Sequence, residues 1–271
     1  MRLLGRRSKN RIAVVKVDGV IADSDSFGAD RARVIGALKV AEHKRVRGVV
    51  LRVNSPGGTV AACQEIFSYV SKLKENGIPV VASMGDVAAS GGVYVSMAAS
   101  EIIANPGTIT GSIGVIIRSN DLSDLYHKVG VSAKVVKSGP YKDMLSTYRA
   151  LSPEEQALLQ GVIDDSHEQF IDVVAAARGK QREEVRTIAD GRIMTGRQAL
   201  GCGLVDLLGG LETAVERAAT LAGIEGKPRV LPMQLRQTML QRILRPLTGH
   251  AGGVVAAHSL PALPMWIMPG W

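Results

Sequence analysis

The feature that most constrains the fold of this chain is a regular alternation of short apolar runs with helical patterns. The apolar runs predict strands over residues 12–17, 47–54, 78–82 and 101–104. Apolar residues at helical spacing predict helices over 29–43, 64–75 and 93–99. The strand runs are apolar nearly throughout, which is typical of strands buried on both faces. The alternation therefore predicts an α/β domain with a mostly parallel sheet.

The second half of the chain continues with more helix than strand. Residues 105–116 read as a loop that runs into another strand, and 204–205 as a short strand. Further predicted elements are a helix at 122–129, a strand at 133–137 and helices at 183–189 and 211–222. Ser152-Pro153-Glu154-Glu155 forms a capping box with proline at the first helical position, and Gly179 ends the helix that it opens.

Composition sets wide limits on function. The chain has 271 residues, of which 46% are hydrophobic, so it can bury one large core. A net charge of +8 favours acidic surfaces, including anionic lipid head groups. No basic patch interleaved with aromatic residues accompanies this charge, which argues against nucleic acid as a partner. Cys63 and Cys202 lie far apart and outside any metal-ligand spacing, so free thiols are predicted.

Three regions are expected: a basic segment at 1–11, a domain at 12–225 and an extension at 226–271. No run of about 20 apolar residues occurs, so no transmembrane helix is predicted and the chain is expected to be cytoplasmic or peripherally membrane-associated. From about residue 246 the extension is apolar but broken by prolines, and it carries Trp266 and Trp271. Disorder is the prediction for this tail, with contact to a neighbouring subunit or a membrane interface as alternatives.

The stretch Ala88-Ala89-Ser90-Gly91-Gly92 follows a buried strand and leads into a small-residue helix. It is close to the G-x-S-x-G turn that exposes a nucleophilic serine, with Ala88 in the place of the first glycine. Small neighbours let a peptide backbone approach the serine hydroxyl, and free backbone N–H groups at the helix start could stabilise an oxyanion. A tight junction that needs small residues for packing would look the same, so this stretch alone leaves both interpretations open.

A serine nucleophile needs a base. The five histidines lie in helical or tail contexts with polar neighbours, which does not favour a Ser-His-Asp triad. A lysine can serve when burial brings its pKa down to roughly 7–8. Lys142 stands out because it follows a Ser-Gly-Pro turn, although an exposed loop lysine is the common alternative. Gly57 and Gly58 follow another buried strand at the carboxyl edge of the predicted sheet, where such sites occur, or else they form a simple turn.

Four motifs in order resemble the signal peptide peptidase A (SppA) family of the Clp protease/crotonase superfamily. They are Asn54-Ser-Pro-Gly-Gly58, Ala88-Ala-Ser-Gly-Gly-Val-Tyr94, Thr110-Gly-Ser-Ile-Gly114 and Lys137-Ser-Gly-Pro-Tyr-Lys-Asp143. The resemblance covers about residues 12–225 and fits the short, single-repeat form. It implies a Clp protease/crotonase-like fold of repeated β-β-α units, with C-terminal helices used in oligomerisation.

The resemblance also implies the site. Ser90 would be the nucleophile, Lys142 the general base, and Ser112 the hydroxyl that orients the lysine. The N–H groups of Gly58 and Gly91 would form the oxyanion hole. The implied reaction is peptide hydrolysis through an acyl-enzyme, without a metal or other cofactor.

The implied substrates are cleaved signal peptides or other apolar peptides. An extended peptide would add as a strand beside residues 55–60, with Gly57 and Thr59 as binding residues and apolar pockets for small side chains. Assembly into a ring or dome of four or eight copies would let Ser90 of one subunit meet Lys142 of the next.

Two features differ from the family pattern: its N-terminal membrane anchor has no counterpart in 1–11, and the tail after about residue 230 matches nothing in it. Two other functions remain open. A crotonase-type acyl-CoA enzyme shares the fold and the oxyanion chemistry, and a non-catalytic, membrane-associated oligomeric scaffold could retain the motifs.

Overall fold

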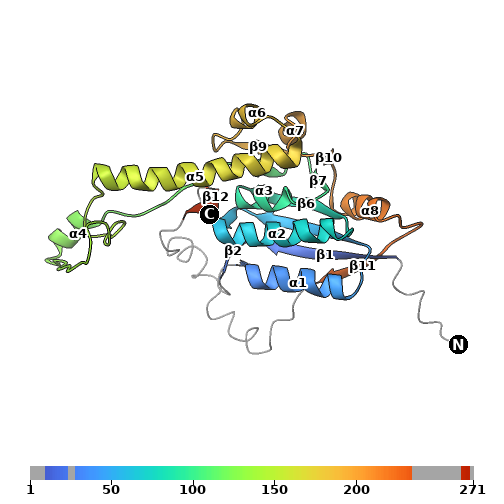
Figure 1. Ribbon diagram of the computed structural model, residues 1–271, viewed down its shortest axis with the longest axis horizontal. Helices are drawn as coiled ribbons and strands as arrows, with labels where there is room; N and C mark the ends of the chain where they lie inside the picture. Colours follow the sequence, from blue (N-terminus) through green and yellow to red (C-terminus); the bar gives the residue numbers. More distant parts are fainter. Residues whose placement is uncertain (1–9, 24–27, 234–263, 269–271) are drawn as a thin grey trace.

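The computed structural model describes residues 10–23, 28–233 and 264–268 (Figure 1). The strands are β1 (Arg11–Asp18), β2 (Val20–Ala22), β3 (Gly28–Asp30), β4 (Gly48–Ser55), β5 (Gly57–Thr59), β6 (Val80–Ala89), β7 (Glu101–Ala104), β8 (Ile109–Gly111), β9 (Ile193–Thr195), β10 (Leu207–Leu208), β11 (Arg229–Met233) and β12 (Met265–Ile267). The helices are α1 (Arg31–His43), α2 (Val60–Glu75), α3 (Gly91–Ser96), α4 (Ser123–Lys128), α5 (Pro153–Arg178), α6 (Arg182–Arg186), α7 (Gly196–Gly201) and α8 (Leu211–Leu221).

The main sheet is parallel along its whole path, in the order β10-β7-β6-β4-β1-β11. Farther along β6, β8 joins the sheet in parallel, and β9 pairs antiparallel with β8. A second, smaller sheet has the order β12-β5-β2-β3. The prediction of an α/β fold with a mostly parallel sheet is confirmed.

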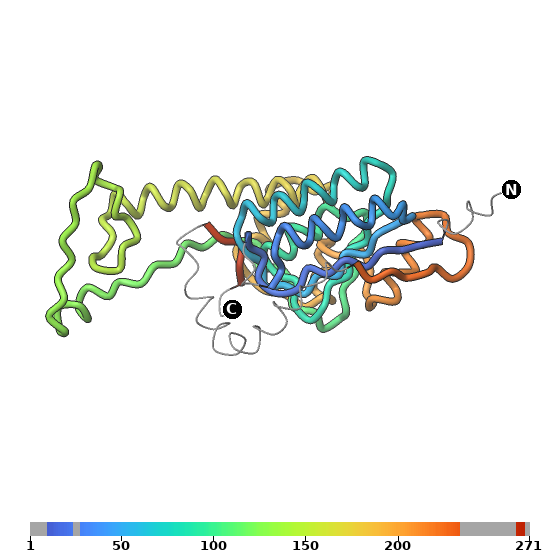
Figure 2. Tube along the Cα trace, turned by 90° about the horizontal axis from the view of Figure 1, so that it is seen from below, coloured from blue at the N-terminus to red at the C-terminus, as the bar shows by residue number. Residues whose placement is uncertain are grey.

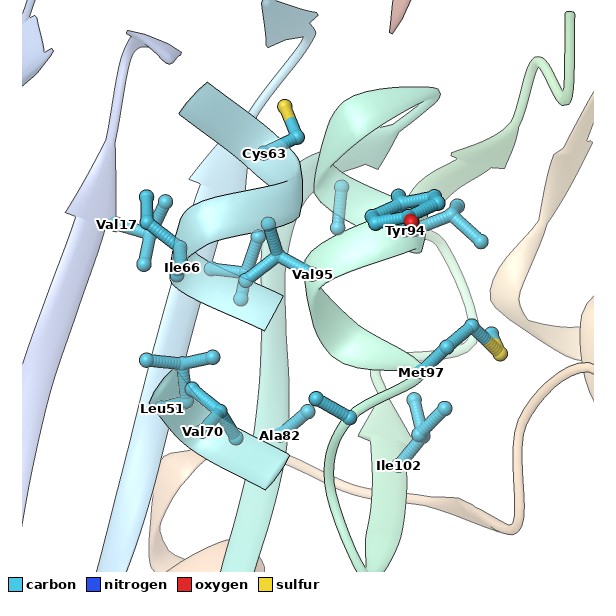
Figure 3. Packing of buried hydrophobic residues seen from close by; sticks show 14 of the residues in the cluster. Val17, Leu51, Cys63, Ile66, Val70, Ala82, Tyr94, Val95, Met97 and Ile102 are labelled. Carbon is cyan, nitrogen blue, oxygen red and sulfur yellow. The ribbon is translucent and has the colours of Figure 1, made fainter. Parts of the chain in front are cut away.

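Both faces of the main sheet are covered, which explains why its strands are apolar nearly throughout. Successive side chains of a strand point to opposite faces. Val15, Val17 and Leu51 belong to the large core under α1, α2 and α3, and Figure 3 shows Val17 and Leu51 beside side chains of α2. Residues of the other parity, such as Val14 and Val50, pack against the alanines of α8.

A long arm leaves the body after β8. Figures 1 and 2 both show α4 at the far end of α5, away from the sheet. The return helix α5 is the one that the capping box predicts: the Ser152 hydroxyl accepts from the Glu155 N–H, and the Glu155 carboxylate accepts from the Ser152 N–H. The helix ends at Gly179, whose φ of 61° is left-handed. In the parts of the chain that the structure describes, no helix combines the length and apolarity needed to cross a membrane.

Three sequence predictions need correction. Residues 133–137 form no strand; they lie in the arm, where no neighbouring strand pairs with them. The strand predicted at 204–205 is instead β10 at Leu207–Leu208. The strand at 78–82 is longer than predicted, because β6 continues through the small-residue stretch to Ala89.

The disorder predicted from about residue 246 can be compared with the structure only at residues 264–268, where β12 pairs antiparallel with β5. Earlier in the extension after residue 225, β11 pairs in parallel with β1. Residues 1–9 of the basic segment, and 234–263 and 269–271 of the tail, lie outside the described residues.

Candidate active site

Ser90 occupies a sharp turn between β6 and α3. Its backbone has φ 52° and ψ −115°, a region that residues with a side chain rarely adopt. The Ser90 N–H donates to the Gly111 carbonyl at 2.8 Å, which ties the turn to β8. A serine with positive φ at a strand-to-helix junction has the backbone geometry of a nucleophile turn, so the structure agrees with the turn that the sequence suggests.

The Ser90 hydroxyl is buried and has no hydrogen-bond partner among the residues that the structure describes. Leaving a buried hydroxyl unpaired costs about 1–3 kcal/mol, and a strained backbone costs a similar amount, of order 1–3 kcal/mol. Both costs fall on this one residue. Such combinations gather at functional sites, because the surrounding fold must stabilise them.

Ser112 lies beside Ser90 because their strands are in register. Ala89 of β6 pairs with Gly111 of β8, so each serine directly follows a paired residue. Ser112 also has a positive φ, 53°, and only 4% of its surface is exposed. Its N–H donates to the Arg192 carbonyl at 2.7 Å. The two serines predicted to share a site are neighbours at the carboxyl edge of the sheet.

The glycines predicted to form the oxyanion hole also converge. A Cβ placed on Gly91 would lie 3.0 Å from the Gly58 nitrogen, and one on Gly57 would lie 2.8 Å from the Gly91 nitrogen. Side chains cannot replace them: a Cβ on Gly58 would lie 1.8 Å from the Ile21 carbonyl oxygen. These positions require glycine because backbones approach too closely for any side chain.

Cys63 lies under this turn, where its sulfur would be 2.6 Å from a Cβ on Gly91. Burial raises the pKa of the Cys63 thiol far above neutrality, so it stays protonated and is a poor nucleophile. Cys63 and Cys202 are both free, as predicted. Among the described residues, no cluster of His, Cys, Asp and Glu side chains could hold a metal ion.

Lys142 does not join Ser90 within one chain. Lys142 is exposed in the arm, next to Asp143, which Arg149 links to Glu155 in the first turn of α5. Ser90 lies farther along this helix: it directly precedes α3, whose Tyr94 contacts Phe170, 15 residues after Glu155. That is a rise of about 22 Å along α5.

Sequence reasoning missed a group of ion pairs close to Lys142 in the arm. Arg149 donates to both Asp143 and Glu155, and the Lys137 amine donates to Asp143 at 2.8 Å. The Arg149 guanidinium, with Lys137, holds the pKa of Asp143 well below its usual range, and with the Ser152 N–H it lowers the pKa of Glu155 to about 2. The available signal was the six-residue spacing of these three charges. It is a weak one, because charge runs usually mark solvated faces.

Thr59 and Gly57, the residues predicted to bind a peptide strand, lie on β5, and β12 of the same chain pairs along that edge. Thr59 pairs with Met265, Gly58 with Trp266 and Gly57 with Ile267. The place where the sequence predicts an extended peptide therefore holds an extended segment of the chain itself.

Comparisons with known proteins identify the family of this chain. Residues 72–225 match the model of Peptidase family S49. The chain is 53% identical over 218 residues to a Synechocystis sp. protein named "Putative protease", covering 80% of this chain and 76% of that protein. It is 36% identical to the chloroplastic serine protease SPPA of Arabidopsis thaliana, over 79% of this chain but only 32% of the plant protein.

The fold also matches a solved structure, that of a serine-to-alanine mutant of the 1510-N membrane-bound stomatin-specific protease. The TM-score is 0.54 at 16% sequence identity, covering 84% of this chain and 99% of the other. The fold prediction of a Clp protease/crotonase-like domain agrees with this match. The chain therefore belongs to peptidase family S49, the SppA/protease IV family of serine peptidases, and carries a single peptidase repeat.

Proposed function

We propose that this serine peptidase is an endopeptidase with a Ser90–Lys142 dyad, which hydrolyses cleaved signal peptides or other apolar peptides. The observation that carries the proposal is Ser90 itself. Its strained backbone and its buried, unpartnered hydroxyl lie beside two converging glycine N–H groups. A hydroxyl that has no hydrogen-bond partner among the described residues is available to a base and a substrate that come from outside.

In the proposed reaction, the Ser90 Oγ attacks the substrate carbonyl carbon while the neutral Lys142 amine takes its proton. The carbonyl oxygen becomes an oxyanion that accepts from the Gly58 and Gly91 N–H groups. The lysine then gives the proton to the leaving amine, and a water molecule hydrolyses the acyl-enzyme with the lysine again as base. Ser112, next to Ser90, would hydrogen-bond the lysine amine and orient it.

The base in this scheme comes from a neighbouring subunit. Lys142 lies in the arm, about 22 Å along α5 from the level of Ser90. Exposed valines, among them Val129, Val131 and Val136, give the arm an apolar surface. A ring or dome of four or eight copies would cover this surface and deliver Lys142 to the next Ser90. Peripheral contact with a membrane is proposed as well, because the chain is basic and its membrane-bound structural relative shares the fold.

The test is cleavage of apolar fluorogenic peptides by the wild type, Ser90→Ala and Lys142→Ala. Both variants should be inactive, and so should Lys142→Arg, because arginine does not give up its proton. Mixing the two alanine variants should restore about a quarter of the wild-type rate, since random exchange pairs an intact serine with an intact lysine at one site in four. Activity in either single variant would contradict the dyad. No recovery despite proven exchange would place both residues in one chain.

The two alternatives make different predictions. A crotonase-type enzyme would turn over acyl-CoA and cleave no peptide. A non-catalytic scaffold would show neither activity. The unpartnered Ser90 hydroxyl favours the peptidase, which needs a free nucleophile. Acyl-CoA chemistry of the crotonase type gives no reason for Ser90, Ser112 and Lys142 to occur together.

A further inference from the structure

The tail segment 264–268 lies between two backbones that would otherwise be open edges. On one side it pairs with β5, where the Met268 N–H donates to the Pro56 carbonyl at 2.8 Å. On the other side, Met265 and Ile116 exchange two hydrogen bonds, at 3.0 and 3.1 Å. Without the tail, β5 and Ile116 would face each other across a gap one strand wide. Such a gap can accept an extended peptide through its main chain alone.

The register of β12 places the Trp266 carbonyl at the proposed oxyanion hole. The bonds at Pro56–Met268 and Val60–Pro264 mark hydrogen-bonded pairs, and such pairs alternate along an antiparallel ladder. Gly58 and Trp266 are thus the pair between them, and the Gly58 N–H faces the Trp266 carbonyl oxygen. That oxygen would also lie 3.0 Å from a Cβ on Gly91. The tail thus puts a peptide carbonyl where the reaction would form its oxyanion.

The Trp266 side chain fills a pocket of aromatic residues. Its indole stacks on Tyr94 with ring centres 4.0 Å apart, and Phe170 lies at 4.9 Å. Trp266 is fully buried, yet within the described parts of the chain its Nε1–H has no hydrogen-bond partner. The pocket therefore suits the size of the indole but not its polar atom. An apolar side chain such as Phe or Leu would fit without that cost.

We propose that residues 264–268 are a tethered competitor of the substrate, and that the Tyr94–Phe170 pocket takes a large apolar side chain of the peptide to be cut. This inference rests on the proposed peptidase function and differs from the expectation of pockets for small side chains. The tether keeps the tail at high local concentration. The unpaired indole N–H keeps its binding weak enough for an apolar peptide to displace it.

Two substitutions at one position should raise activity to different extents. Trp266→Ala removes the side chain that fills the pocket and should raise kcat/KM for an apolar peptide by about tenfold. Trp266→Phe keeps one aromatic ring but loses the buried area of the second, so tail binding should weaken less and kcat/KM should rise by only about threefold. Trp271→Ala, in the same tail but outside β12, is the matched control and should behave as the wild type.

A second readout separates this inference from the proposed function. Amide hydrogen exchange over residues 56–60 should be fastest in Trp266→Ala, intermediate in Trp266→Phe and slowest in the wild type, whether or not any peptide is cleaved. If exchange follows this order and no variant cleaves peptide, the tail docks but the proposed function fails. If the wild type cleaves peptide and Trp266→Ala changes neither exchange nor kcat/KM, the tethered competitor is wrong. Equal effects of Trp266→Ala and Trp271→Ala would also overturn it.

Discussion

Ser90 carries two local costs, a left-handed backbone and a buried hydroxyl without a partner. The nearby Gly111 has a φ of 78°, yet it has no side chain to strain. A serine at such a position is retained against stability, as expected where a strained group serves function. Stability and activity should therefore change in opposite directions at this residue.

Ser90→Ala should stabilise the protein by about 1–2 kcal/mol, because it removes the unpaired hydroxyl. Ser90→Gly should add roughly another 1 kcal/mol, since glycine adopts a positive φ without strain. Both variants should be inactive. Urea unfolding measures the stability and peptide cleavage the activity. Lower stability in both variants would mean that the Ser90 hydroxyl has a partner in solution.

Gly91→Ala tests the oxyanion hole. Its Cβ would lie 2.6 Å from the Cys63 sulfur and 3.0 Å from the Gly58 nitrogen. We expect a loss of about 1–3 kcal/mol in stability from overpacking and a fall in kcat of about 100-fold from the displaced N–H donor.

The double variant Gly91→Ala with Cys63→Ala separates the two effects, since it removes the clash with sulfur and leaves the crowded N–H groups. Urea unfolding should show that stability partly recovers, while kcat should stay low. Full recovery of kcat in the double variant would show that Gly91 serves packing alone.

Residues that form one short motif were predictable, and those defined by distant partners were not. Ser90 and Gly58 follow buried strands, so local pattern placed them at the sheet edge, and the structure agrees. The contacts of Trp266 were not predicted. Its contacts with Tyr94 and Gly58 link residues far apart in sequence, and no local pattern reports them. Arg149 was missed for another reason: its partners are only six residues away, but charges at such spacing usually mark a solvated face.

At the scale of elements, the arm and the tail show why strand prediction failed in both directions. Residues 133–137 have the composition of a strand but lack a neighbour, and Val136 is fully exposed. The tail is rich in proline, yet Met265–Ile267 pairs on two sides. Pro264 does not interrupt this ladder, because only its carbonyl takes part. A strand exists where a partner edge is available, and sequence pattern does not show the partner.

The arm should loosen in acid. Arg149 lowers the pKa of Asp143 and Glu155 below their ordinary values, that of Glu155 from 4.5 to about 2. A lowered carboxyl pKa stabilises the fold above the ordinary value, and this stabilisation is lost as pH falls towards the folded-state value. Pepsin, which works in this range, should cut the arm slowly at pH 4 and rapidly near pH 2.

Arg149→Gln provides the control for this prediction. It removes the guanidinium that both carboxylates share, so pepsin should cut its arm rapidly already at pH 4. Mass spectrometry of the fragments would locate the cuts within residues 123–150. Equal cutting of wild type and Arg149→Gln at pH 4 would show that these ion pairs do not hold the arm.

At the scale of the whole molecule, Lys142 in the arm lies far from Ser90 in the body, so we predict that activity depends on assembly. Val136→Asp places a charge on the apolar surface of the arm and should dissociate the proposed oligomer, with loss of peptide cleavage. Light scattering measures the mass. Val230→Asp on β11, an exposed valine of the body, is the matched control and should keep both mass and activity. A Val136→Asp protein with wild-type mass would exclude this surface as the interface.

The buried indole of Trp266 has a consequence for observing the enzyme at work. The chain has two tryptophans, so Trp271→Phe leaves Trp266 as its sole indole fluorophore. Stacked on Tyr94 and shielded from water, that indole should emit at shorter wavelength than one in solvent. Displacement by a peptide should shift its emission to the red. The fluorescence of the unlabelled protein would then report, in real time, how much of the cleft is filled by the tail and how much by substrate.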